Sequence, residues 1–274
     1  MMQKLAVIGD PVGHSLSPQI HMTWIDSMAL EASYESIRVP TGETAAALED
    51  FAYKTFRGLN VTLPHKQAVL SSVSHMSPAV IAIGAANTLT QSEPGQWSAD
   101  NTDAPGLMAA LKRVGVVSLE GKSVLLLGAG GAARAALFAL DQAGADITLL
   151  NRTVEKAGKA LSDCCARDHS FGPLDDLPRI AESADLVINS ASLGHGGEFF
   201  ALPKGEGRLF LEMSYGAPAG PQIDHARSQG WAAEDGLGML VCQAAESFRI
   251  WFGGELPDVE IALEACRETL RLTE

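Results

Sequence analysis

Short apolar runs alternate along the chain with longer segments whose apolar residues recur at helical spacing. The runs are typical of buried β-strands, and a polar, hairpin-like segment lies at residues 91–96. Strands are predicted at residues 5–8, 32–39, 123–127, 146–150, 185–189 and 208–212. Helices are predicted from residue 18 and at residues 43–54, 104–114, 132–140, 154–163, 238–251 and 257–272. This alternation predicts an α/β protein in which the loops after parallel strands gather at one sheet edge.

The strand at residues 123–127 runs into a glycine-rich turn and then into a helix. A backbone that passes close to a pyrophosphate needs residues without a Cβ atom, and the N–H groups of the following helix then face the phosphates. Gly128, Gly130 and Ala133 fill the three positions of a dinucleotide-binding fingerprint. The candidate phosphate-binding residues of the turn are Gly128, Ala129, Gly130, Gly131 and Ala132. Any tight strand-to-helix turn can look similar, so the turn alone leaves other interpretations open.

The next strand ends in the segment Asn151-Arg152-Thr153, and Lys156 follows shortly after. An NAD site usually has an acidic side chain here that binds the ribose 2′-hydroxyl, whereas a 2′-phosphate requires a cation and no carboxylate. Two cations and two neutral polar groups therefore favour NADP. The competing interpretation is a helix-start turn with an arginine at the surface.

The length favours two domains, because 274 residues are many for a single hydrophobic core. Hydrophobic residues make up 46% and charged residues 19% of the chain, without a low-complexity tract, which excludes a disordered protein. A polar turn at residues 118–122 precedes the glycine motif, and the boundary is placed near Asp103. The first domain is then expected at residues 1–103 and the second at residues 104–237.

The net charge, the apolar runs and the cysteines indicate which partners, which cellular compartment and which metal sites can be expected. The chain has 20 Lys and Arg against 33 Asp and Glu, and its net charge of −13 opposes non-specific binding to nucleic acid or to an anionic membrane. No apolar run approaches the roughly 20 residues of a membrane span, and the N-terminal apolar run is too short for a signal peptide, so a cytoplasmic protein is expected. The four cysteines lack C-x-x-C spacing, and only His169 lies near the pair Cys164-Cys165. No metal site is therefore predicted, and the thiols are expected to be buried or half-buried.

Polar side chains follow the strands of the first domain. Ser17 suits the N-cap of a helix, or Ser15 and Ser17 together present two hydroxyls to a small carboxylate. Lys66 is expected in the first turn of a helix, where the macrodipole disfavours a cation and an anionic partner is therefore sought. Asn87 and Asp103 lie at turns, where such side chains usually serve the turn itself but can also bind a polyol. One sheet edge is predicted to gather Ser15, Ser17, Thr62, Lys66, Asn87 and Asp103.

Seven short motifs occur in a fixed order along the chain. They are Ser15-Leu16-Ser17-Pro18, Asn60-Val61-Thr62-Leu63-Pro64-His65-Lys66, Gly84-Ala85-Ala86-Asn87-Thr88, Asn101-Thr102-Asp103, the glycine turn at 128–135, Asn151-Arg152-Thr153 and Gln243-Ala244-Ala245. In order and spacing they resemble the shikimate dehydrogenase family, nearly end to end. Each motif is moderately common, but seven in register are highly specific.

The resemblance implies an α/β substrate domain and a Rossmann-type, doubly wound NADP domain, with the helices of residues 238–274 returning to the substrate domain. It implies the reversible NADPH-dependent reduction of 3-dehydroshikimate to shikimate, a step of aromatic amino acid biosynthesis. Lys66 and Asp103 would be the catalytic pair, because an ammonium can stabilise and protonate the alkoxide that develops at the C3 carbonyl. The substrate-binding residues would be Ser15, Ser17, Thr62, Asn87, Asp103, Tyr215 and Gln243. Met213, Gly236 and Met239 match positions that line the nicotinamide.

Three residues depart from the family pattern, and two alternatives remain. Ala99 stands where glycine is usual, Ala191 replaces a hydroxyl residue, and Glu212 replaces an aspartate; the segment after Tyr215 is also altered. One alternative is a quinate/shikimate dehydrogenase that uses NAD, which the Asn-Arg-Thr run disfavours. The other is a non-catalytic relative that only binds a cyclic acid, although binding alone would not require both Lys66 and Asp103. A monomer and a homodimer are both compatible with the sequence.

Overall fold

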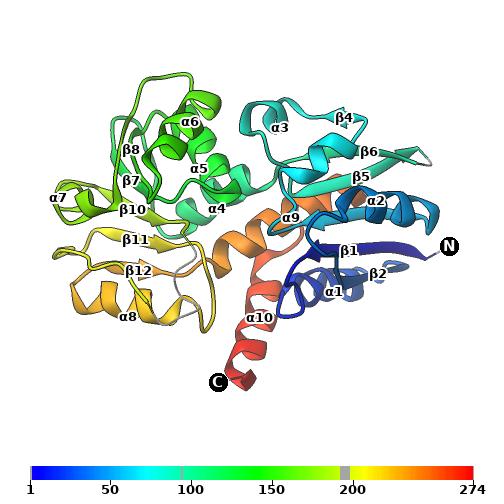
Figure 1. Ribbon diagram of the computed structural model, residues 1–274. Helices are drawn as coiled ribbons and strands as arrows, with labels where there is room; N and C mark the ends of the chain where they lie inside the picture. The colour runs from blue at the N-terminus through cyan, green and yellow to red at the C-terminus, as the bar shows by residue number, and fades with distance from the viewer. Residues whose placement is uncertain (1, 94, 192–197, 274) are drawn as a thin grey trace. The chain divides into compact units, whose positions relative to one another are not determined.

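The predicted strands form two separate sheets in the computed structural model, which describes residues 2–93, 95–191 and 198–273 (Figure 1). The chain divides into two units, each with its own sheet. Unit 1 consists of Met1–Gly106 and Leu240–Glu274, and unit 2 of Leu107–Met239. The unit boundaries fall within the helices α4 (Asp103–Arg113) and α9 (Leu237–Phe252).

Unit 1 contains a mixed sheet with the strand order β2-β1-β3-β5-β6-β4. β1 pairs in parallel with β2 and β3, whereas β5 pairs antiparallel with β3 and β6. The β5–β6 hairpin confirms the hairpin-like segment that the sequence predicts. The strands are β1 (Gln3–Gly9), β2 (Ala32–Arg38), β3 (Phe56–Val61), β4 (His75–Met76), β5 (Thr88–Glu93) and β6 (Gln96–Asp100).

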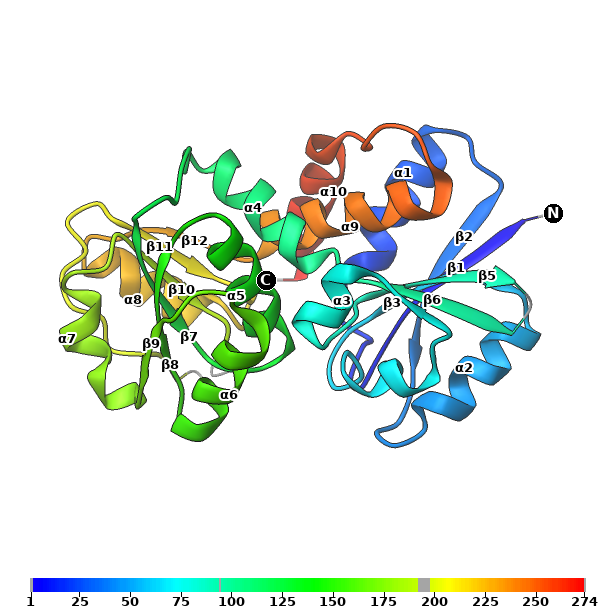
Figure 2. The same cartoon turned by 90° about the horizontal axis from the view of Figure 1, so that it is seen from above.

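Helices cover both faces of this sheet because its inner strands are apolar on both sides. Ala6 and Ile8 of β1 share a buried cluster with Leu48 and Phe51 of α2. The helices α1, α9 and α10 cover the opposite face (Figure 1, Figure 2). The helices that lie within unit 1 are α1 (Ser17–Ser27), α2 (Thr44–Tyr53), the 3-10 helix η1 (Ala68–Ser72), α3 (Pro78–Ile83) and α10 (Val259–Thr273).

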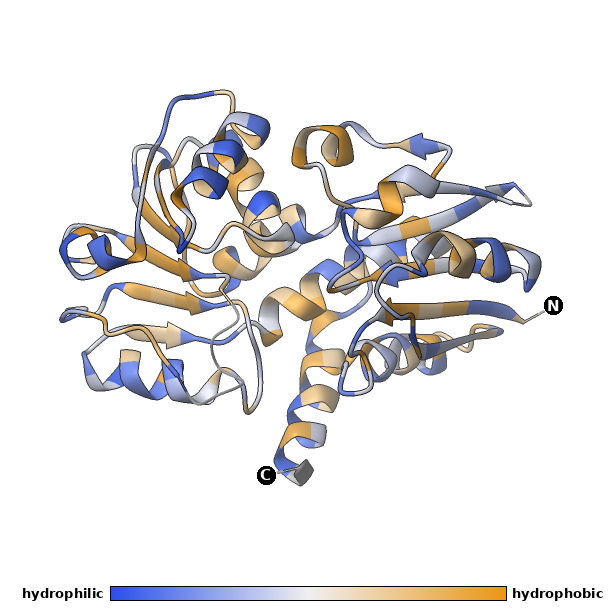
Figure 3. Cartoon of the chain, in the orientation of Figure 1, coloured by the Kyte–Doolittle hydropathy of each residue, from blue (hydrophilic) through white to orange (hydrophobic). Residues whose placement is uncertain are grey.

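Unit 2 contains a parallel sheet with the strand order β12-β11-β10-β7-β8-β9. Val124 and Leu126 of β7 pack into a core with α4, α5 and α6, and Leu125 and Leu127 pack into a second core with α7 and α8. The strands are accordingly strongly hydrophobic (Figure 3). The strands are β7 (Ser123–Leu127), β8 (Asp146–Leu150), β9 (Ser170–Gly172), β10 (Leu186–Asn189), β11 (Leu209–Glu212) and β12 (Ala232–Glu234). The helices are α5 (Gly131–Gln142), α6 (Val154–Cys164), the 3-10 helix η2 (Leu174–Asp176), α7 (Leu177–Ala181) and α8 (Gly220–Ser228).

This strand order confirms the doubly wound fold. The chain passes from β7 to β8 on one side and returns to place β10 on the other side of β7. Parallel α/β sheets bind ligands at such a switch point, outside the carboxyl ends of the strands. The sequence pattern did not predict β9 and β12, because they have three residues each and are largely exposed. Among the described residues, no helix is both long and apolar enough to cross a membrane.

Candidate functional site

Lys66 lies in a turn between β3 and η1, so the expectation that it occupies the first turn of a helix is wrong. The reason is a competing hydrogen bond. The Lys66 carbonyl accepts the N–H of Ala86 at 2.8 Å, which uses the group that a helix would offer to Leu70. Leu70 N–H bonds to Gln67 O instead, at 3.2 Å, and this closes a tighter turn.

Asp103 is the anionic partner of Lys66. Lys66 Nζ lies 2.6 Å from Asp103 Oδ2, and the two side chains are 16% and 6% exposed. Asp103 is the first residue of α4, where the helix dipole favours a carboxylate, and its N–H donates to Asn101 Oδ1 at 3.1 Å. A charge-assisted hydrogen bond in this setting is short and directional. The fold thus holds an ammonium against a carboxylate 37 residues further along the chain.

Asn87 holds the second oxygen of the same carboxylate. Its Nδ2 donates to Asp103 Oδ1 at 2.9 Å, and the residue is only 2% exposed. Its Oδ1 accepts the backbone N–H of Thr102 at 2.7 Å. Because a backbone N–H can only donate, this contact fixes which way the amide points. Both oxygens of Asp103 are therefore engaged, which fixes the carboxylate that Lys66 faces.

Helix α9 completes this group with residues that sequence reasoning found only in part. Gln243, one of the predicted substrate-binding residues, lies in this group, with its Oε1 3.0 Å from Asn87 Nδ2. Ser247, fully buried one helical turn later, hydrogen-bonds to Thr88 at 2.8 Å and to Thr102 at 3.0 Å. Ser247 was missed, although residues at i and i+4 share a helix face and the spacing from Gln243 offered that signal.

Ser15 and Ser17 meet at the start of α1. Ser15 Oγ donates to Ser17 Oγ at 3.1 Å and accepts the N–H of Ser17 at 3.2 Å. The proposed N-cap role of Ser17 is wrong: Leu16 is the N-cap, and Ser17 is the first helical residue. Thr62, directly after β3, donates its N–H to Ile8 O at 2.9 Å. The two hydroxyls lie beside the N–H groups of the first turn of α1, an arrangement that suits a carboxylate.

A buried tyrosine joins the serine pair to the residues around Asn87. Burial raises the pKa of Tyr34 well above its usual value, and a hydrogen bond with Ser17 opposes this rise only in part. The Tyr34 hydroxyl donates to Asn60 Oδ1 at 2.6 Å, and Asn60 Nδ2 donates to Ser247 Oγ at 3.0 Å. Tyr34 and Asn60 therefore connect two groups of predicted site residues that lie in the same unit.

In unit 2 the glycine turn follows β7 as the sequence predicts. Gly128 has a φ of +98°, and a Cβ atom there would lie 2.8 Å from Ser190 Oγ, so only glycine fits. Gly130 is the N-cap of α5, is exposed, and has open space where a Cβ would be. The first N–H groups of α5 have no acceptor within the helix. The remaining residues of the turn are partly exposed: Ala129, Gly131 and Ala132. A turn of only glycine and alanine at a helix N-terminus fits a pyrophosphate.

The candidate 2′-phosphate residues lie at the end of the neighbouring strand. Gly128 N–H donates to Leu150 O at 2.9 Å, which brings the end of β8 beside the glycine turn. Asn151 Nδ2 donates to Thr153 O at 2.8 Å, so Asn151 also serves the local turn. Arg152 and Thr153 are exposed, and Lys156 is exposed on the first turns of α6. Two exposed cations beside the glycine turn fit an additional phosphate.

Met213, Gly236 and Met239 lie in or next to the loops at the carboxyl end of the same sheet. Gly236 N–H donates to Ser214 O at 2.8 Å, and a Cβ at Gly236 would overlap Met213 O. Met239 is 7% exposed and packs into the core of unit 2. Tyr215 is half-buried in the loop after β11 and belongs to unit 2, unlike the other predicted substrate-binding residues.

Matches to three family models cover most of the chain. Residues 7–89 match the shikimate dehydrogenase substrate binding domain, and residues 109–195 match shikimate / quinate 5-dehydrogenase. Residues 236–267 match the shikimate 5'-dehydrogenase C-terminal domain. A curated shikimate dehydrogenase (NADP(+)) from Hyphomonas neptunium is 43% identical over 100% of both chains. The chain belongs to the shikimate dehydrogenase family.

Other members of the shikimate dehydrogenase family agree over the same length. A shikimate dehydrogenase (NADP(+)) from Methanocella arvoryzae is 38% identical over 98% of this chain and 100% of its own. A crystal structure of shikimate 5-dehydrogenase from Thermus thermophilus, in complex with NADP(H) and shikimate, has a TM-score of 0.86 at 36% identity. That comparison covers 97% of this chain and 99% of the other.

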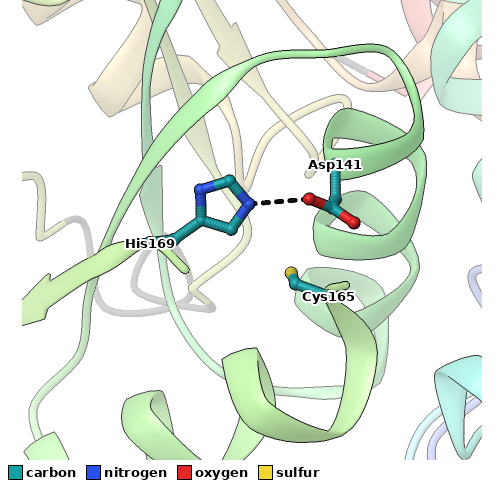
Figure 4. A group of neighbouring side chains, drawn as sticks. All are labelled: Asp141, Cys165 and His169. Carbon is teal, nitrogen blue, oxygen red and sulfur yellow. Dashed lines mark hydrogen bonds and ion pairs between the residues drawn. The ribbon is translucent and has the colours of Figure 1, made fainter. Parts of the chain in front are cut away.

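Outside these sites, this family member has a group of possible metal ligands: Asp141, Cys165 and His169 (Figure 4). Each is already used within the fold. Asp141 accepts from His169 Nε2 at 2.9 Å and from Arg167 Nε at 3.0 Å, and burial raises the pKa of Cys165 to about 12. A guanidinium on the carboxylate and a protonated thiol oppose cation binding, so we interpret the group as structural.

Proposed function

We propose that the chain catalyses the reversible NADPH-dependent reduction of 3-dehydroshikimate to shikimate, a step of aromatic amino acid biosynthesis. The observation that carries the proposal is the pairing of Lys66 Nζ with Asp103 Oδ2 at 2.6 Å, with Asn87 on the other carboxylate oxygen. The names and NADP(H) complex of the relatives support the same activity. The four cysteines form no disulfide, which supports the proposal that the enzyme is cytoplasmic.

Lys66 acts as the general acid in this proposal. NADPH, when bound, supplies the hydride to the C3 carbonyl, and negative charge then develops on the carbonyl oxygen. The Lys66 ammonium donates a hydrogen bond to this oxygen and transfers a proton to it. In the reverse direction the neutral amine accepts the hydroxyl proton. Asp103 holds the amine in place and accepts a hydrogen bond from the substrate.

The remaining site residues bind and orient. Ser15 and Ser17, beside the first turn of α1, bind the carboxylate of the substrate. The ring hydroxyls, or the region next to the carboxylate, are bound by Thr62, Asn87, Gln243 and Tyr215. In unit 2 the glycine turn holds the pyrophosphate. The 2′-phosphate is bound by Asn151, Arg152, Thr153 and Lys156, and Met213, Gly236 and Met239 line the nicotinamide. A net charge of −13 supports an enzyme whose anion sites are local clusters and which has no nucleic-acid partner.

The test is a spectrophotometric assay of shikimate and quinate, each with NADP and with NAD. Shikimate with NADP is expected to be the best pair by at least about tenfold in kcat/KM, or roughly 1.4 kcal/mol. A preference for NAD or for quinate would instead identify the shikimate/quinate alternative. Binding of shikimate without turnover of any pair would indicate a non-catalytic relative and would overturn the proposal.

A further inference from the structure

A buried side-chain pair joins the ends of β10 and β11. Asn189 Nδ2 donates to Glu212 Oε2 at 2.5 Å, and Glu212 Oε1 accepts the N–H of Ser214 at 2.9 Å. Asn189 is 2% and Glu212 is 3% exposed. Both residues lie at the carboxyl edge of the parallel sheet, where such sheets bind their ligands.

Glu212 can fill this position only with two acceptor oxygens, since both of its partners are donors. The Asn189 amide cannot rotate to compensate, because its Oδ1 accepts the N–H of Ala191 at 3.0 Å. Burial raises the pKa of Glu212, and the Asp235 carboxylate adds to the rise, while the bonds from Ser214 and Asn189 oppose it. A buried carboxylate is costly unless such donors satisfy it, so the site is built for a carboxylate.

On one side, the pair continues to the glycine turn. Ser190, next to Asn189, donates both its N–H and its Oγ to Leu127 O, at 2.9 and 2.6 Å. Leu127 is the last residue of β7, and Ser190 Oγ occupies the space where a side chain at Gly128 would lie. The conformation at the start of the glycine turn is therefore coupled to Ser190, which directly follows the Asn189 that Glu212 contacts.

On the other side, the pair continues to Met213 and Gly236. Met213 N–H donates to Asn189 O at 2.8 Å, and Ser214 O accepts the N–H of Gly236 at the same distance. The contact of Glu212 with the Ser214 N–H fixes the backbone between these two bonds. One hydrogen-bonded chain therefore runs from the glycine turn, across the ends of β7, β10 and β11, to Gly236.

We propose that Glu212 is a positioning residue, which holds the glycine turn and the loop around Met213 and Gly236 in the relative placement that one dinucleotide spans. The inference rests on the proposed function, since it names how this chain orders its NADP(H) site. Glu212 itself is not proposed to contact the cofactor. It acts through Asn189 and Ser214, and an aspartate at this position would keep two acceptor oxygens for the same two donors.

The test compares Glu212→Gln with Glu212→Asp. Glutamine keeps the size of the side chain but replaces one carboxylate oxygen with an NH₂ group, which would face the Asn189 amide or the Ser214 N–H, both donors. Aspartate keeps both acceptor oxygens. The dissociation constant of NADPH, measured by fluorescence titration without substrate, is expected to rise about tenfold in Glu212→Gln, or roughly 1.4 kcal/mol, and less than threefold in Glu212→Asp. In steady-state kinetics, KM for NADP should rise while kcat at saturation changes less than twofold. Shikimate binding, in unit 1, should not change.

Two outcomes would overturn the inference: NADPH affinity of Glu212→Gln within twofold of the unmodified protein, or an equal loss of shikimate affinity, which would indicate a general structural role. If Glu212→Gln does not fold, Ser190→Ala is tested instead, because Ser190 lies where the hydrogen-bonded chain reaches the glycine turn. The NADPH dissociation constant of Ser190→Ala is expected to rise about threefold. No change there would also contradict the inference. Failure of the unmodified protein to bind NADPH would refute the proposed function instead.

Discussion

The two candidate sites are built in opposite ways. In unit 1, side chains define the site: the half-buried Lys66 and the buried Asp103 and Asn87 are held by hydrogen bonds of 2.6–2.9 Å. In unit 2, the backbone defines the site, through a turn that contains Gly128 and Gly130, and the charged side chains near it are exposed. A reaction that moves a proton needs groups fixed to within fractions of an ångström, whereas a flexible phosphate chain can be bound by N–H groups and mobile cations.

The difference predicts where substitutions have large effects. A buried group that is part of a network has no substitute when it is removed, and its partners lose a hydrogen bond in the process. An exposed cation contributes less, because solvent screens its charge and neighbouring cations replace it in part. Substitutions in unit 1 should therefore affect turnover strongly, and substitutions of the exposed cations in unit 2 should shift cofactor preference moderately.

The largest effect is expected for Lys66→Ala. Loss of the general acid should lower kcat by roughly 10² or more, while the affinity for shikimate stays similar. Stopped-flow or steady-state assays with a parallel binding titration measure both quantities. Lys54→Ala is the matched control, because Lys54 is a 56% exposed lysine at the C-cap of α2 in the same unit, paired with Asp50. Turnover of Lys66→Ala close to that of Lys54→Ala would remove Lys66 from the mechanism.

A smaller effect is expected for Arg152→Ala. The 2′-phosphate would lose one cation, and the affinity for NADP should fall about tenfold, or roughly 1.4 kcal/mol, while the affinity for NAD stays the same. The measurement is kcat/KM with each cofactor. Arg179→Ala is the control, because Arg179 is a 69% exposed arginine of the same unit that pairs with Asp176. An equal loss with both cofactors would argue against a 2′-phosphate role for Arg152.

The smallest effect is expected at Asp141 and concerns stability. Asp141 is a buried carboxylate of unit 2 that pairs with a cation, as Asp103 does in unit 1. Burial raises the pKa of Asp141, but hydrogen bonds from Ala166 N–H, His169 and Arg167 outweigh burial and hold the pKa below its usual value. A lowered pKa contributes stability that is complete above about pH 4 and is lost as the pH falls toward the folded-state pKa.

Asp141→Asn should therefore lower the free energy of unfolding by about 1 kcal/mol at pH 7, because its amide would face the His169 donor. Urea unfolding at pH 7 and at stepwise lower pH measures the difference, which should narrow below about pH 4. Asp176→Asn, at a half-exposed ion pair, should change the stability by less than about 0.5 kcal/mol. A difference that does not depend on pH would show that the charge of Asp141 is not what stabilises unit 2. Cofactor affinity should be unaffected in both variants.

The sequence by itself determined the features that depend on neighbouring residues. The apolar run that ends in Gly128, the helix that follows, and the polar segment after β8 are local patterns, and the structure has each of them where the sequence predicts it. The alternation of strands and helices also determined the α/β class, because buried parallel strands require apolar residues on both faces. The doubly wound order was implied by the family resemblance. Short elements such as β9 were missed for lack of enough residues to show a period.

Only the tertiary structure decided how distant residues combine. The sequence placed Lys66 in a helix, but the bond from Ala86 to its carbonyl holds it in a turn and leaves its amine against Asp103. The orientation of Asn87, the contribution of Ser247 and the chain of bonds through Glu212 likewise depend on partners far away in sequence. A local pattern reports the conformation a segment prefers, whereas a buried hydrogen bond depends on where a second segment lies once the sheet and helices have packed.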